Sequence, residues 1–335
     1  MRAIILVGGL GTRLRPLTNW VPKQMLPIVN KPMIEHVINH LAKFGVSDVI
    51  LSLGFEPDVF KSAYPEGFCA GVPVSYVIED EPLDTAGAIA FAATQSKIND
   101  TFLVCNGDVI TELEINDLFN FHKARGSEAT ISLTPVEDPA RYGVVETDED
   151  GKVLEFIEKP SGLTISTNLI NAGVYIMEPS VLDRISSSGP VSVEKETFPS
   201  LVSEEKIFAF ASDKYWLDAG TPSTYLQANL ELINGFREIK FPEKHETAKV
   251  DGGAEIICSV LGQEVTVGSG ALIRNSVVME GAFIGEGAFI EGSVIGRGAQ
   301  IMNDAKVIGM SIVGHGETVI SGEVLSGVKK PETIV

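Results

Sequence analysis

Histidine, cysteine and long apolar runs are all scarce in this sequence. Its 335 residues include five histidines and three cysteines, Cys69, Cys105 and Cys258, which lie far apart. An odd number of widely spaced cysteines forms neither a disulfide framework nor a zinc knuckle, and it fits a reducing cytoplasm. The chain also lacks an apolar run of ~18 residues, the length that a membrane span needs, and an apolar signal core at its start. We therefore expect a cytoplasmic protein without a membrane segment.

Basic residues are in deficit over the whole chain, but not near the N-terminus. Against 45 acidic residues there are 26 lysines and arginines, which gives a formal net charge of −19. This balance argues against a nucleic-acid partner, because proteins that bind nucleic acids carry basic surfaces. Residues 1–34 reverse it: they contain no Asp or Glu, and their cations are Arg2, Arg13, Arg15, Lys23 and Lys31. Such a local block favours a small, highly charged anion as the ligand.

A glycine-rich turn lies inside this basic block. The apolar run Ile4–Val7 predicts a short buried strand, and it leads into Gly8-Gly9-Leu10-Gly11-Thr12-Arg13. Glycines allow a sharp turn and a close approach to a ligand, and backbone N–H groups left free in the turn bind anions. The spacing fits neither the Walker A loop nor the dinucleotide-binding fingerprint. Glycines alone would be typical of a plain strand-to-helix turn, but Arg13 and Lys23 favour a triphosphate ligand.

Short apolar strands alternate with helices through the first 235 residues. The predicted strands are Ile4–Val7, Val49–Leu53, Val74–Ile78, Phe102–Cys105, Ala129–Thr134, Tyr142–Thr147 and Lys152–Ile157, and the predicted helices are Met33–Phe44, Thr85–Gln95 and Pro222–Asn234. This order predicts an α/β fold with a Rossmann-like mixed, mostly parallel sheet that helices cover on both faces. Ligands of such sheets bind past the carboxyl ends of the strands, where Gly8, Glu79 and Asp108 fall.

The period of the apolar residues changes to about six in the last third of the chain. Aliphatic residues recur at Val267, Ile273, Val278, Ile284, Ile290, Ile295, Ile301, Val307, Val313, Val319 and Leu325. This is the hexapeptide repeat of a left-handed parallel β-helix, in which three hexapeptides form one triangular coil, and its length predicts roughly three to four coils. An open sheet edge at its end needs a cap or a partner, so we expect a homo-oligomer. His315, the histidine within these repeats, is expected at a corner of a coil.

These patterns predict two domains that are joined by a polar linker. Residues 1–237 form the α/β domain, residues 238–250 the linker, and residues 251–335 the β-helix domain. The linker is assigned because the segment from Glu238 to Lys249 is polar and contains Pro242.

The stretch GGLGTRLRPLT, followed by Pro22-Lys23 and Lys31-Pro32, resembles the signature of the nucleotide-sugar pyrophosphorylases. These sugar-1-phosphate nucleotidyltransferases join a sugar 1-phosphate to a nucleoside triphosphate and release pyrophosphate. The resemblance continues to about residue 235 and implies the nucleotidyltransferase fold for this part of the chain. It implies an NTP and a sugar 1-phosphate as substrates.

The resemblance assigns roles in nucleotide binding and catalysis. It implies that the nucleotide is bound by Leu6, Gly8, Gly9, Gly11, Thr12, Arg13, Lys23, Glu79, Thr85 and Gly87, and that the catalytic residues are Arg13, Lys23, Asp108 and Asp218. Asp108 and Asp218 would hold Mg²⁺, since hard divalent cations prefer carboxylate and phosphate oxygens. Asp84 departs from the family pattern, which has a glycine there. A solvated acidic turn is the alternative for Glu79, and a turn or cap role is the alternative for Asp108.

Later motifs resemble the part of the family that binds the sugar phosphate. They assign this function to Gly143, Glu158, Lys159, Asn171 and Gly173, with Lys159 on the phosphate and Glu158 on sugar hydroxyls. Glu194-Lys195 resembles a helix start of the mannose 1-phosphate branch, for which a cap or surface role is the alternative. On its own, the Glu158-Lys159-Pro160 motif is typical of an exposed turn, so the order of the motifs supports the assignment.

The motifs favour GTP and mannose 1-phosphate as the substrates. Lys23-Gln24 and Lys31-Pro32 also resemble the glucose-1-phosphate thymidylyltransferases, which are the alternative. Two other classes are compatible with the domain order. One is a non-catalytic regulatory paralogue, which tends to lose the Arg, Lys and Asp positions retained here. The other is a bifunctional uridylyltransferase-acetyltransferase, which needs a longer β-helix and an acyl-transfer histidine.

Overall fold

The computed structural model of the protein describes residues 1–54, 57–160, 165–186, 189–235 and 241–332. Packing divides the chain into two compact units, and this division does not follow the order of the sequence. The first unit comprises Met1–Gly9 and Ile34–Trp216, and the second comprises Leu10–Met33 and Leu217–Val335. The latter half of the glycine-rich turn therefore belongs to the same unit as the β-helix. The predicted boundary at residues 237 and 238 lies outside the described residues, so the division into domains stays a prediction.

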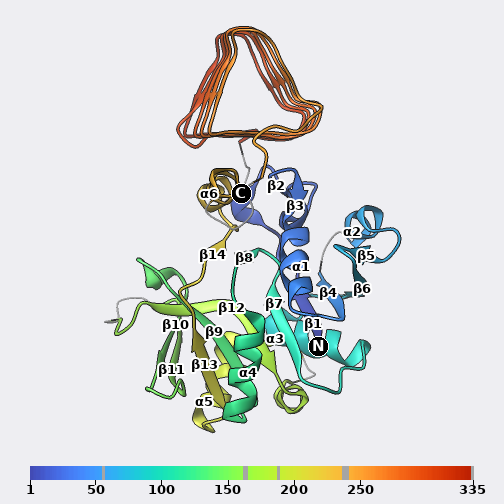
Figure 1. Ribbon diagram of the computed structural model, residues 1–335, viewed down its shortest axis with the longest axis vertical. Helices are drawn as coiled ribbons and strands as arrows, with labels where there is room; N and C mark the ends of the chain where they lie inside the picture. Colours follow the sequence, from blue (N-terminus) through green and yellow to red (C-terminus); the bar gives the residue numbers. More distant parts are fainter. Residues whose placement is uncertain (55–56, 161–164, 187–188, 236–240, 333–335) are drawn as a thin grey trace. The chain divides into compact units, whose positions relative to one another are not determined.

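The first unit is built on a ten-stranded mixed sheet (Figure 1). Its parallel part has the order β7–β1–β4–β6, with β7 at Phe102–Asn106, β1 at Arg2–Leu6, β4 at Asp48–Leu53 and β6 at Val72–Ile78. Strands β1, β4 and β7 are almost wholly buried, which is why they appear as continuous apolar runs in the sequence.

The other half of this sheet is largely antiparallel. Strand β12 (Leu169–Met177) runs antiparallel to β7, and β10 (Gly143–Thr147) and β11 (Val153–Glu158) follow it as a hairpin. Strand β9 (Ala129–Pro135) pairs with β12 and with β13 (Ile207–Ala211), and β5 (Phe68–Cys69) pairs with β6. The predicted α/β fold with a mixed sheet is confirmed.

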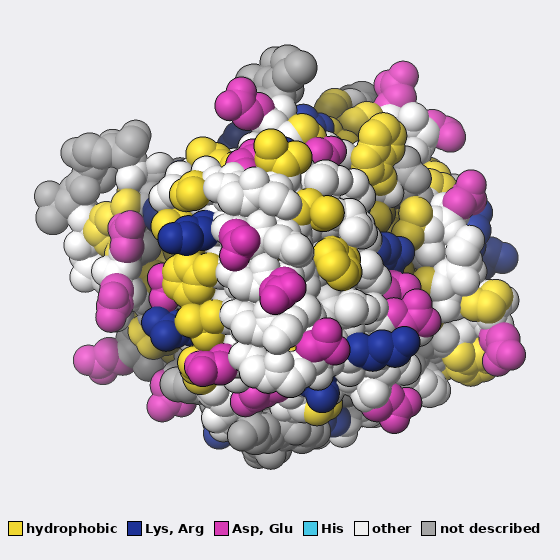
Figure 2. Space-filling view, turned by 90° about the horizontal axis from the view of Figure 1, so that it is seen from above, with side chains coloured by type: hydrophobic (Ala, Val, Ile, Leu, Met, Phe, Trp, Pro, Cys, Tyr) yellow, Lys and Arg dark blue, Asp and Glu magenta, His cyan; other side chains and the backbone are white. Residues whose placement is uncertain are grey.

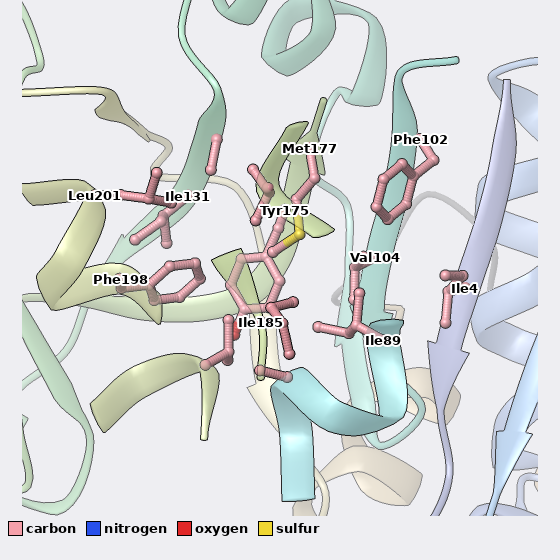
Figure 3. Close-up of a cluster of buried hydrophobic side chains, with 14 of the residues drawn as sticks. Ile4, Ile89, Phe102, Val104, Ile131, Tyr175, Met177, Ile185, Phe198 and Leu201 are labelled. Atoms are coloured by element: carbon pink, nitrogen blue, oxygen red, sulfur yellow. The ribbon is translucent and has the colours of Figure 1, made fainter. Parts of the chain in front are cut away.

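The helices of the described residues are α1 (Met33–Lys43), α2 (Pro57–Ala63), α3 (Asp84–Gln95), α4 (Ile115–Arg125), α5 (Phe198–Ser203) and α6 (Pro222–Asn234). Three of these six, α1, α3 and α6, match the predicted ones, and the other three were not predicted. Helices α3 and α5 supply side chains to the core of the first unit, where Tyr175 of β12 lies near Phe198 and Ile89 (Figure 3). None of the described helices is long and apolar enough to cross a membrane.

In the second unit, α6 holds a small hairpin of strands β2 (Pro27–Ile28) and β3 (Lys31–Pro32). Asn229 in α6 is fully buried, and its Oδ1 accepts a hydrogen bond from the Val29 backbone N–H at 2.8 Å. The helix begins with a capping box at Thr221 and ends at Gly235, which adopts the left-handed conformation. These local signals explain why the predicted bounds of this helix are those of the structure.

The remainder of the second unit is a parallel β-helix with a triangular cross-section (Figure 1). It has three five-stranded sheets. The first contains β15 (Lys249–Val250), β18 (Thr266–Val267), β21 (Phe283–Ile284), β24 (Gln300–Ile301) and β27 (Thr318–Val319), and the second contains β16 (Glu255–Ile257), β19 (Leu272–Arg274), β22 (Phe289–Glu291), β25 (Lys306–Ile308) and β28 (Val324–Ser326). The third contains β17 (Val260–Leu261), β20 (Val277–Val278), β23 (Val294–Ile295), β26 (Ile312–Val313) and β29 (Lys329–Lys330). Two shorter strands, β8 (Val109–Thr111) and β14 (Trp216–Asp218), lie outside the β-helix. The β-helix that the repeat predicts is thus confirmed, and its geometry is consistent with the left-handed form.

The β-helix has five coils, so the predicted number of three to four is too low. The first coil was missed because its inward residues Val250 and Ile256 stand among polar and glycine residues and precede the regular six-residue pattern. The last coil ends in Lys329–Lys330, which replace the aliphatic residues of the strands below them.

Glycines occur at the corners of the coils because the backbone of the next coil lies where a Cβ atom would be. A Cβ atom at Gly262 would come within 2.6 Å of the Glu280 backbone N, and one at Gly268 within 2.8 Å of the Glu286 backbone N. Real Cβ atoms do not approach other atoms so closely. The six-residue recurrence of glycine therefore follows from how tightly consecutive coils stack.

A ladder of buried serines joins neighbouring coils at another corner. Ser259, Ser276 and Ser293 are fully buried. The Ser259 Oγ accepts a hydrogen bond from the Ser276 N–H at 3.1 Å, and the Ser276 Oγ accepts one from the Ser293 N–H at 3.1 Å. Each hydroxyl also donates to a carbonyl of its own coil, as Ser276 does to Arg274. Between them, the hydroxyls satisfy backbone N–H groups that water cannot reach.

The outer surface of the molecule carries charges of both signs. On the face in Figure 2, acidic and basic side chains are interspersed with small apolar areas. On the β-helix, pairs such as Arg274–Glu291 and Arg297–Glu280 have N···O distances of 3.2 and 3.0 Å. Such exposed pairs contribute little to stability, so the coils are held by their interior and by backbone hydrogen bonds.

Replacing Ser276 with alanine should destabilise the β-helix by about 1–3 kcal/mol, because the buried Ser293 N–H would lose its acceptor. Urea unfolding followed by circular dichroism measures this change. Ser326→Ala is the matched control, since Ser326 is exposed on the last coil and should alter stability by less than ~0.5 kcal/mol. Equal midpoints for both variants would contradict the role of the ladder.

Candidate functional site

The first part of the glycine-rich turn and Asp108 follow neighbouring parallel strands. Strands β1 and β7 are paired with Leu6 opposite Asn106, and the Gly107 N–H donates to the Leu6 carbonyl at 3.0 Å. Gly8 therefore leaves the end of β1 where Asp108 leaves the end of β7. Gly8 and Gly9 are exposed, whereas Asp108 is only 9% exposed. The structure thus brings these residues to one carboxyl edge of the sheet, where ligands of such folds bind.

Glu79 follows the end of β6 at the same edge, and its carboxylate holds the segment around it. Its Oε2 accepts a hydrogen bond from the Leu83 N–H at 3.0 Å, and its Oε1 accepts one from the Ser52 hydroxyl at 3.3 Å. Each carboxylate oxygen can accept more than one bond. Glu79 thus organises the acidic turn in which it stands. Its oxygens can still accept hydrogen bonds from the N–H groups of a nucleobase.

Asp84 adopts the backbone conformation that a glycine would take. Its φ angle is +58°, in the left-handed region that Asp tolerates better than most residues. Its Oδ1 accepts a hydrogen bond from the Thr85 N–H at 2.7 Å, which supports the start of α3. Although Asp84 replaces the glycine of the family pattern, the backbone here keeps a conformation that glycine would also adopt.

Thr85 and Gly87 connect the start of α3 to the segment before Glu194. The Thr85 hydroxyl donates to Glu194 Oε2 at 2.7 Å and accepts from the Val193 N–H at 2.8 Å. A Cβ at Gly87 would come within 2.9 Å of Leu83 Cβ. Gly87 thus has a packing role inside the protein, and the Thr85 hydroxyl holds Glu194 in place.

The residues predicted to bind the sugar phosphate lie on adjacent strands. Gly143 of β10 is opposite Glu158 of β11, and a Cβ at Gly143 would come within 2.8 Å of Phe156 and 2.9 Å of Glu158 Oε2. The Lys159 ammonium lies 2.9 Å from Glu158 Oε1, and its side chain is 69% exposed. Glu158 therefore lies over Gly143 and keeps an accessible cation beside it.

Asn171 and Gly173 form an irregularity in β12 beside this cluster. The register of β12 against β9 shifts between Asn171 and Tyr175. Asn171 Oδ1 accepts from the Gly173 N–H, and Asn171 Nδ2 donates to the Tyr175 hydroxyl, both at 2.9 Å. Gly173 has a φ of +73°, and a Cβ there would come within 2.6 Å of Asn106 Nδ2. The irregularity therefore requires glycine and fixes the Asn171 side chain.

Tyr175, Tyr142 and Trp216 are neighbours of this cluster that sequence reasoning missed. Burial, with the nearby carboxylates of Glu194 and Glu158, raises the pKa of Tyr175, so its hydroxyl stays neutral. The rings of Tyr142 and Trp216 meet edge to face at 5.6 Å, and Trp216 Nε1 donates to the Ala172 carbonyl at 2.8 Å. Their positions in the sequence could have indicated them, because Tyr142 directly precedes Gly143 and Trp216 stands two residues before Asp218.

In the second unit, the turn continues as a compact loop, which we call the loop 11–18. Gly11 has a φ of +61°, and a Cβ there would lie 3.1 Å from both Lys23 Cβ and Thr18 Cγ2. The Thr18 hydroxyl donates to the Gly11 carbonyl at 2.7 Å, and residues Thr12–Leu14 form a 3-10 turn. Thr12 and Arg13 are exposed at its surface. The glycine thus lets Lys23 lie directly against the loop.

Arg13 and Asp218 face each other in the second unit. Arg13 Nη2 lies 3.9 Å from Asp218 Oδ2, and Asp218 Oδ1 accepts from the Gly220 N–H at 2.8 Å. The Arg13 side chain is 56% exposed and that of Asp218 is 21% exposed. The carboxylate is therefore oriented by its own backbone while one oxygen faces a partly solvated surface.

The donors at these positions have the chemistry that a hard divalent cation requires. Asp108 and Asp218 offer carboxylate oxygens, which suit Mg²⁺ better than nitrogen or sulfur ligands do. Among the residues that the structure describes, no group of three or more His, Cys, Asp or Glu could hold a metal ion. Each of these carboxylates could therefore supply only part of the shell of such a cation, with water and phosphate oxygens as the remainder.

Sequence comparison matches two family models to this chain. One, described as "Nucleotidyl transferase", matches residues 2–235, and one described as "GMPPB C-terminal domain" matches residues 243–329. A mannose-1-phosphate guanylyltransferase of Mycobacterium tuberculosis is 37% identical over 278 residues, which cover 80% of this chain and 77% of that protein. A probable mannose-1-phosphate guanylyltransferase 1 of Oryza sativa subsp. japonica is 41% identical, over 80% of this chain and 73% of its own length.

Solved structures with a similar fold include two that cover about two thirds of the chain. HddC from Yersinia pseudotuberculosis is 31% identical, with a TM-score of 0.60, over 70% of this chain and 99% of that one. A provisionally described glucose-1-phosphate thymidylyltransferase from Bacillus anthracis is 26% identical, with a TM-score of 0.62, over 68% of this chain and 94% of that one.

Gly173→Ala should destabilise the protein by several kcal/mol, since the left-handed backbone costs a non-glycine residue about 1–2 kcal/mol and the new methyl would displace Asn106. Gly189→Ala is the matched control, because Gly189 has a φ of +79° and nothing within 4 Å of the added Cβ. It should lose only the backbone contribution. Chemical unfolding compares the two, and equal losses would show that the Asn106 contact does not constrain this position.

Proposed function

This chain belongs to the nucleotidyl transferase family, and from that premise we propose that it transfers a nucleotidyl group from GTP to mannose 1-phosphate. The products are GDP-mannose and pyrophosphate. The observation that carries this proposal is the family match over residues 2–235, together with relatives that are named mannose-1-phosphate guanylyltransferases. The chain is a nucleotidyltransferase; the choice of GTP and mannose 1-phosphate is the proposed part.

The proposed reaction is an in-line attack of a phosphate oxygen of the sugar 1-phosphate on the α-phosphorus of the NTP. A bond forms between that oxygen and the α-phosphorus while the bond to the β-phosphate oxygen breaks, so pyrophosphate leaves with the electron pair. The sugar phosphate is already ionised at neutral pH, so no general base is required. This agrees with motifs whose assigned residues include no histidine.

The residues of the chain have separate roles in this proposal. The backbone of residues 8–12 and the Arg13 guanidinium bind the β- and γ-phosphates, and Lys23 stabilises negative charge at the α-phosphate. Lys159 binds the phosphate of the sugar, and Glu158, beside it at 2.9 Å, accepts hydrogen bonds from sugar hydroxyls. The Asn171 amide lines the same cluster because its hydrogen bond to Tyr175 fixes it.

We further propose that Asp108 and Asp218 hold one Mg²⁺, as the sequence predicts. When bound, the cation supplies positive charge to phosphate oxygens. The chain's own contribution is to orient the carboxylates, and the Gly220 N–H does so for Asp218. The Arg13 guanidinium, 3.9 Å from Asp218 Oδ2, places a positive charge beside this carboxylate.

A glucose-1-phosphate thymidylyltransferase is the second candidate function. The similar solved structure from Bacillus anthracis carries that description, and Lys23-Gln24 and Lys31-Pro32 fit it as well. The two candidates differ in the base and in the sugar, but they share the reaction and the phosphate-binding residues. Only the substrate preference therefore separates them.

We also propose that the protein is a cytoplasmic homo-oligomer that associates through the β-helix. All three cysteines are free, as a reducing compartment would keep them. Around the last coil, Ile320, Val324 and Val328 are 64%, 58% and 41% exposed. Apolar side chains beside an open strand edge favour contact with a second copy.

A turnover assay that measures pyrophosphate release tests the substrates. We expect kcat/KM for GTP with mannose 1-phosphate to exceed that for dTTP with glucose 1-phosphate by at least about 100-fold, because a site that hydrogen-bonds one base edge discriminates strongly against another. A preference for the second pair would replace the proposed substrates by the alternative. Absence of pyrophosphate release with every pair would contradict the proposed reaction.

Lys159→Gln should raise KM for the sugar 1-phosphate and lower kcat/KM by about 100-fold, or ~3 kcal/mol, the scale of one electrostatic donor in a transition state. KM for the NTP should stay unchanged, because this residue is assigned to the sugar phosphate alone. Lys214→Gln, at an exposed lysine of the same unit, is the matched control and should behave as the wild type. Equal effects on both substrates would refute the assignment of Lys159.

A further inference from the structure

Two side chains near the end of the β-helix hold carbonyl groups of the loop 11–18. His315 Nε2 lies 2.9 Å from the Leu17 carbonyl oxygen, and Lys329 Nζ donates to the Arg13 carbonyl at 3.0 Å. All four residues belong to the second unit. Arg13 is the residue to which the proposed function assigns the β- and γ-phosphates. The β-helix therefore contacts the backbone of a residue in the candidate nucleotide site.

The hydrogen bonds of His315 define its tautomer. Its Nδ1 accepts from the Arg297 backbone N–H at 2.9 Å, so the proton of the neutral ring resides on Nε2 and points to the Leu17 carbonyl. Burial is the main cause that lowers the pKa of His315, which favours this neutral form. The expected position of His315 at a corner of a coil is compatible with these contacts. The ring connects that corner to the loop.

The two adjacent lysines of the last coil have different partners. Lys330 Nζ forms an ion pair with Glu323 at 2.7 and 2.9 Å, entirely within the β-helix. Lys329 instead donates to an uncharged carbonyl of the loop, and partial burial lowers its pKa. A hydrogen bond from a charged donor is stronger than one between neutral groups. Lys329 thus has the means to hold the Arg13 backbone firmly.

A close packing contact lies next to these hydrogen bonds. A Cβ added at Gly314 would come within 3.2 Å of Pro16 Cβ and Cγ and within 3.2 Å of the Lys330 carbonyl. Pro16, Leu17 and Leu14 are themselves buried. These distances are shorter than those of most Cβ contacts, so the corner of the coil packs closely against the loop. Three separate contacts thus hold the loop from Arg13 to Leu17.

We propose that His315 and Lys329 are positioning residues for nucleotide binding, which act by fixing the backbone of Arg13 and Leu17. The direction of a side chain is set by the backbone from which it leaves, so the Lys329 contact determines where the Arg13 guanidinium can reach. That guanidinium now lies 3.9 Å from Asp218. This inference rests on the proposed function for its ligand, whereas the contacts to the loop do not.

Kinetics of lysine variants test the proposal. Lys329→Met should raise KM for GTP by about tenfold, the loss of one hydrogen bond from a charged donor, with KM for mannose 1-phosphate unchanged. Lys329→Arg should restore KM for GTP to near the wild-type value. Lys330→Met is the matched control: it removes the ion pair with Glu323 and should lower stability, but it should leave both KM values unchanged. A rise in both KM values with Lys329→Met, or the same rise with Lys330→Met, would overturn the proposal.

Variants of His315 separate its two hydrogen bonds. His315→Asn keeps an acceptor near the Arg297 N–H but is too short to reach Leu17, whereas His315→Gln places an amide donor near the position of Nε2. We expect His315→Asn to raise KM for GTP several-fold and His315→Gln to raise it less. Equal kinetics for Asn, Gln and the wild type would remove His315 from the proposal.

Hydrogen–deuterium exchange tests the contacts without reference to activity. In Lys329→Met, peptides that cover residues 11–18 should exchange faster than in the wild type, while those of residues 260–300 should exchange as before. Unchanged exchange in the loop would overturn the inference even if the wild type turns over GTP and mannose 1-phosphate. Faster exchange in a protein without any turnover would instead support the loop contacts and contradict the proposed function.

Discussion

The repulsion between two phosphorylated substrates is the constraint on which the site depends. A chain with a formal net charge of −19 offers a poor average environment for anions, so the cations have to be concentrated where the phosphates bind. Under the proposed roles, Arg13 and Lys23 supply these cations, and the glycine-rich turn adds backbone N–H groups that attract anions without adding a charge. Arg2, from the same basic block, is instead paired with Asp48 at 3.0 Å. The Asp218 carboxylate lies 3.9 Å from the Arg13 guanidinium, so it can orient this side chain while the lysines and arginines around it keep their positive charge.

Patterns that are local in sequence predicted three of the six described helices, α1, α3 and α6. The bounds of α6 agree because its capping box at Thr221 and its left-handed Gly235 are both determined by neighbouring residues. The number of coils was underestimated because the ladder positions Val250 and Ile256 lie among polar residues, and only their pairing with Val267 and Ile273 identifies them. The assignment of residues 10–33 to the unit of the β-helix could not be predicted either, since it depends on contacts such as Asn229 with Val29.

The candidate site was predicted as a set of motifs whose residues contact ligands. In several cases the structure gives another reason for the residue type, which is contact with other parts of the protein. Gly87 and Gly143 face Leu83 and Phe156, so side chains of the protein exclude a Cβ at both positions. Asp84 holds the left-handed conformation at a position where the family has a glycine, which single-sequence reasoning could not foresee. The Tyr142–Trp216 pair was missed because it arises between residues 74 positions apart in the chain, and no periodicity connects them.

The contacts of His315 and Lys329 give the β-helix a part in forming the loop 11–18. These hydrogen bonds join residues 298 and 316 positions apart, so the loop gains them only when the last coils are in place. The chain entropy of closing a long loop opposes contacts of such long sequence separation. The Gly11–Thr18 hydrogen bond, by contrast, can form locally. The loop therefore has a local turn that the sequence near it specifies and a final position that the distant end of the chain specifies, and a change in the last coil can alter the second without altering the first.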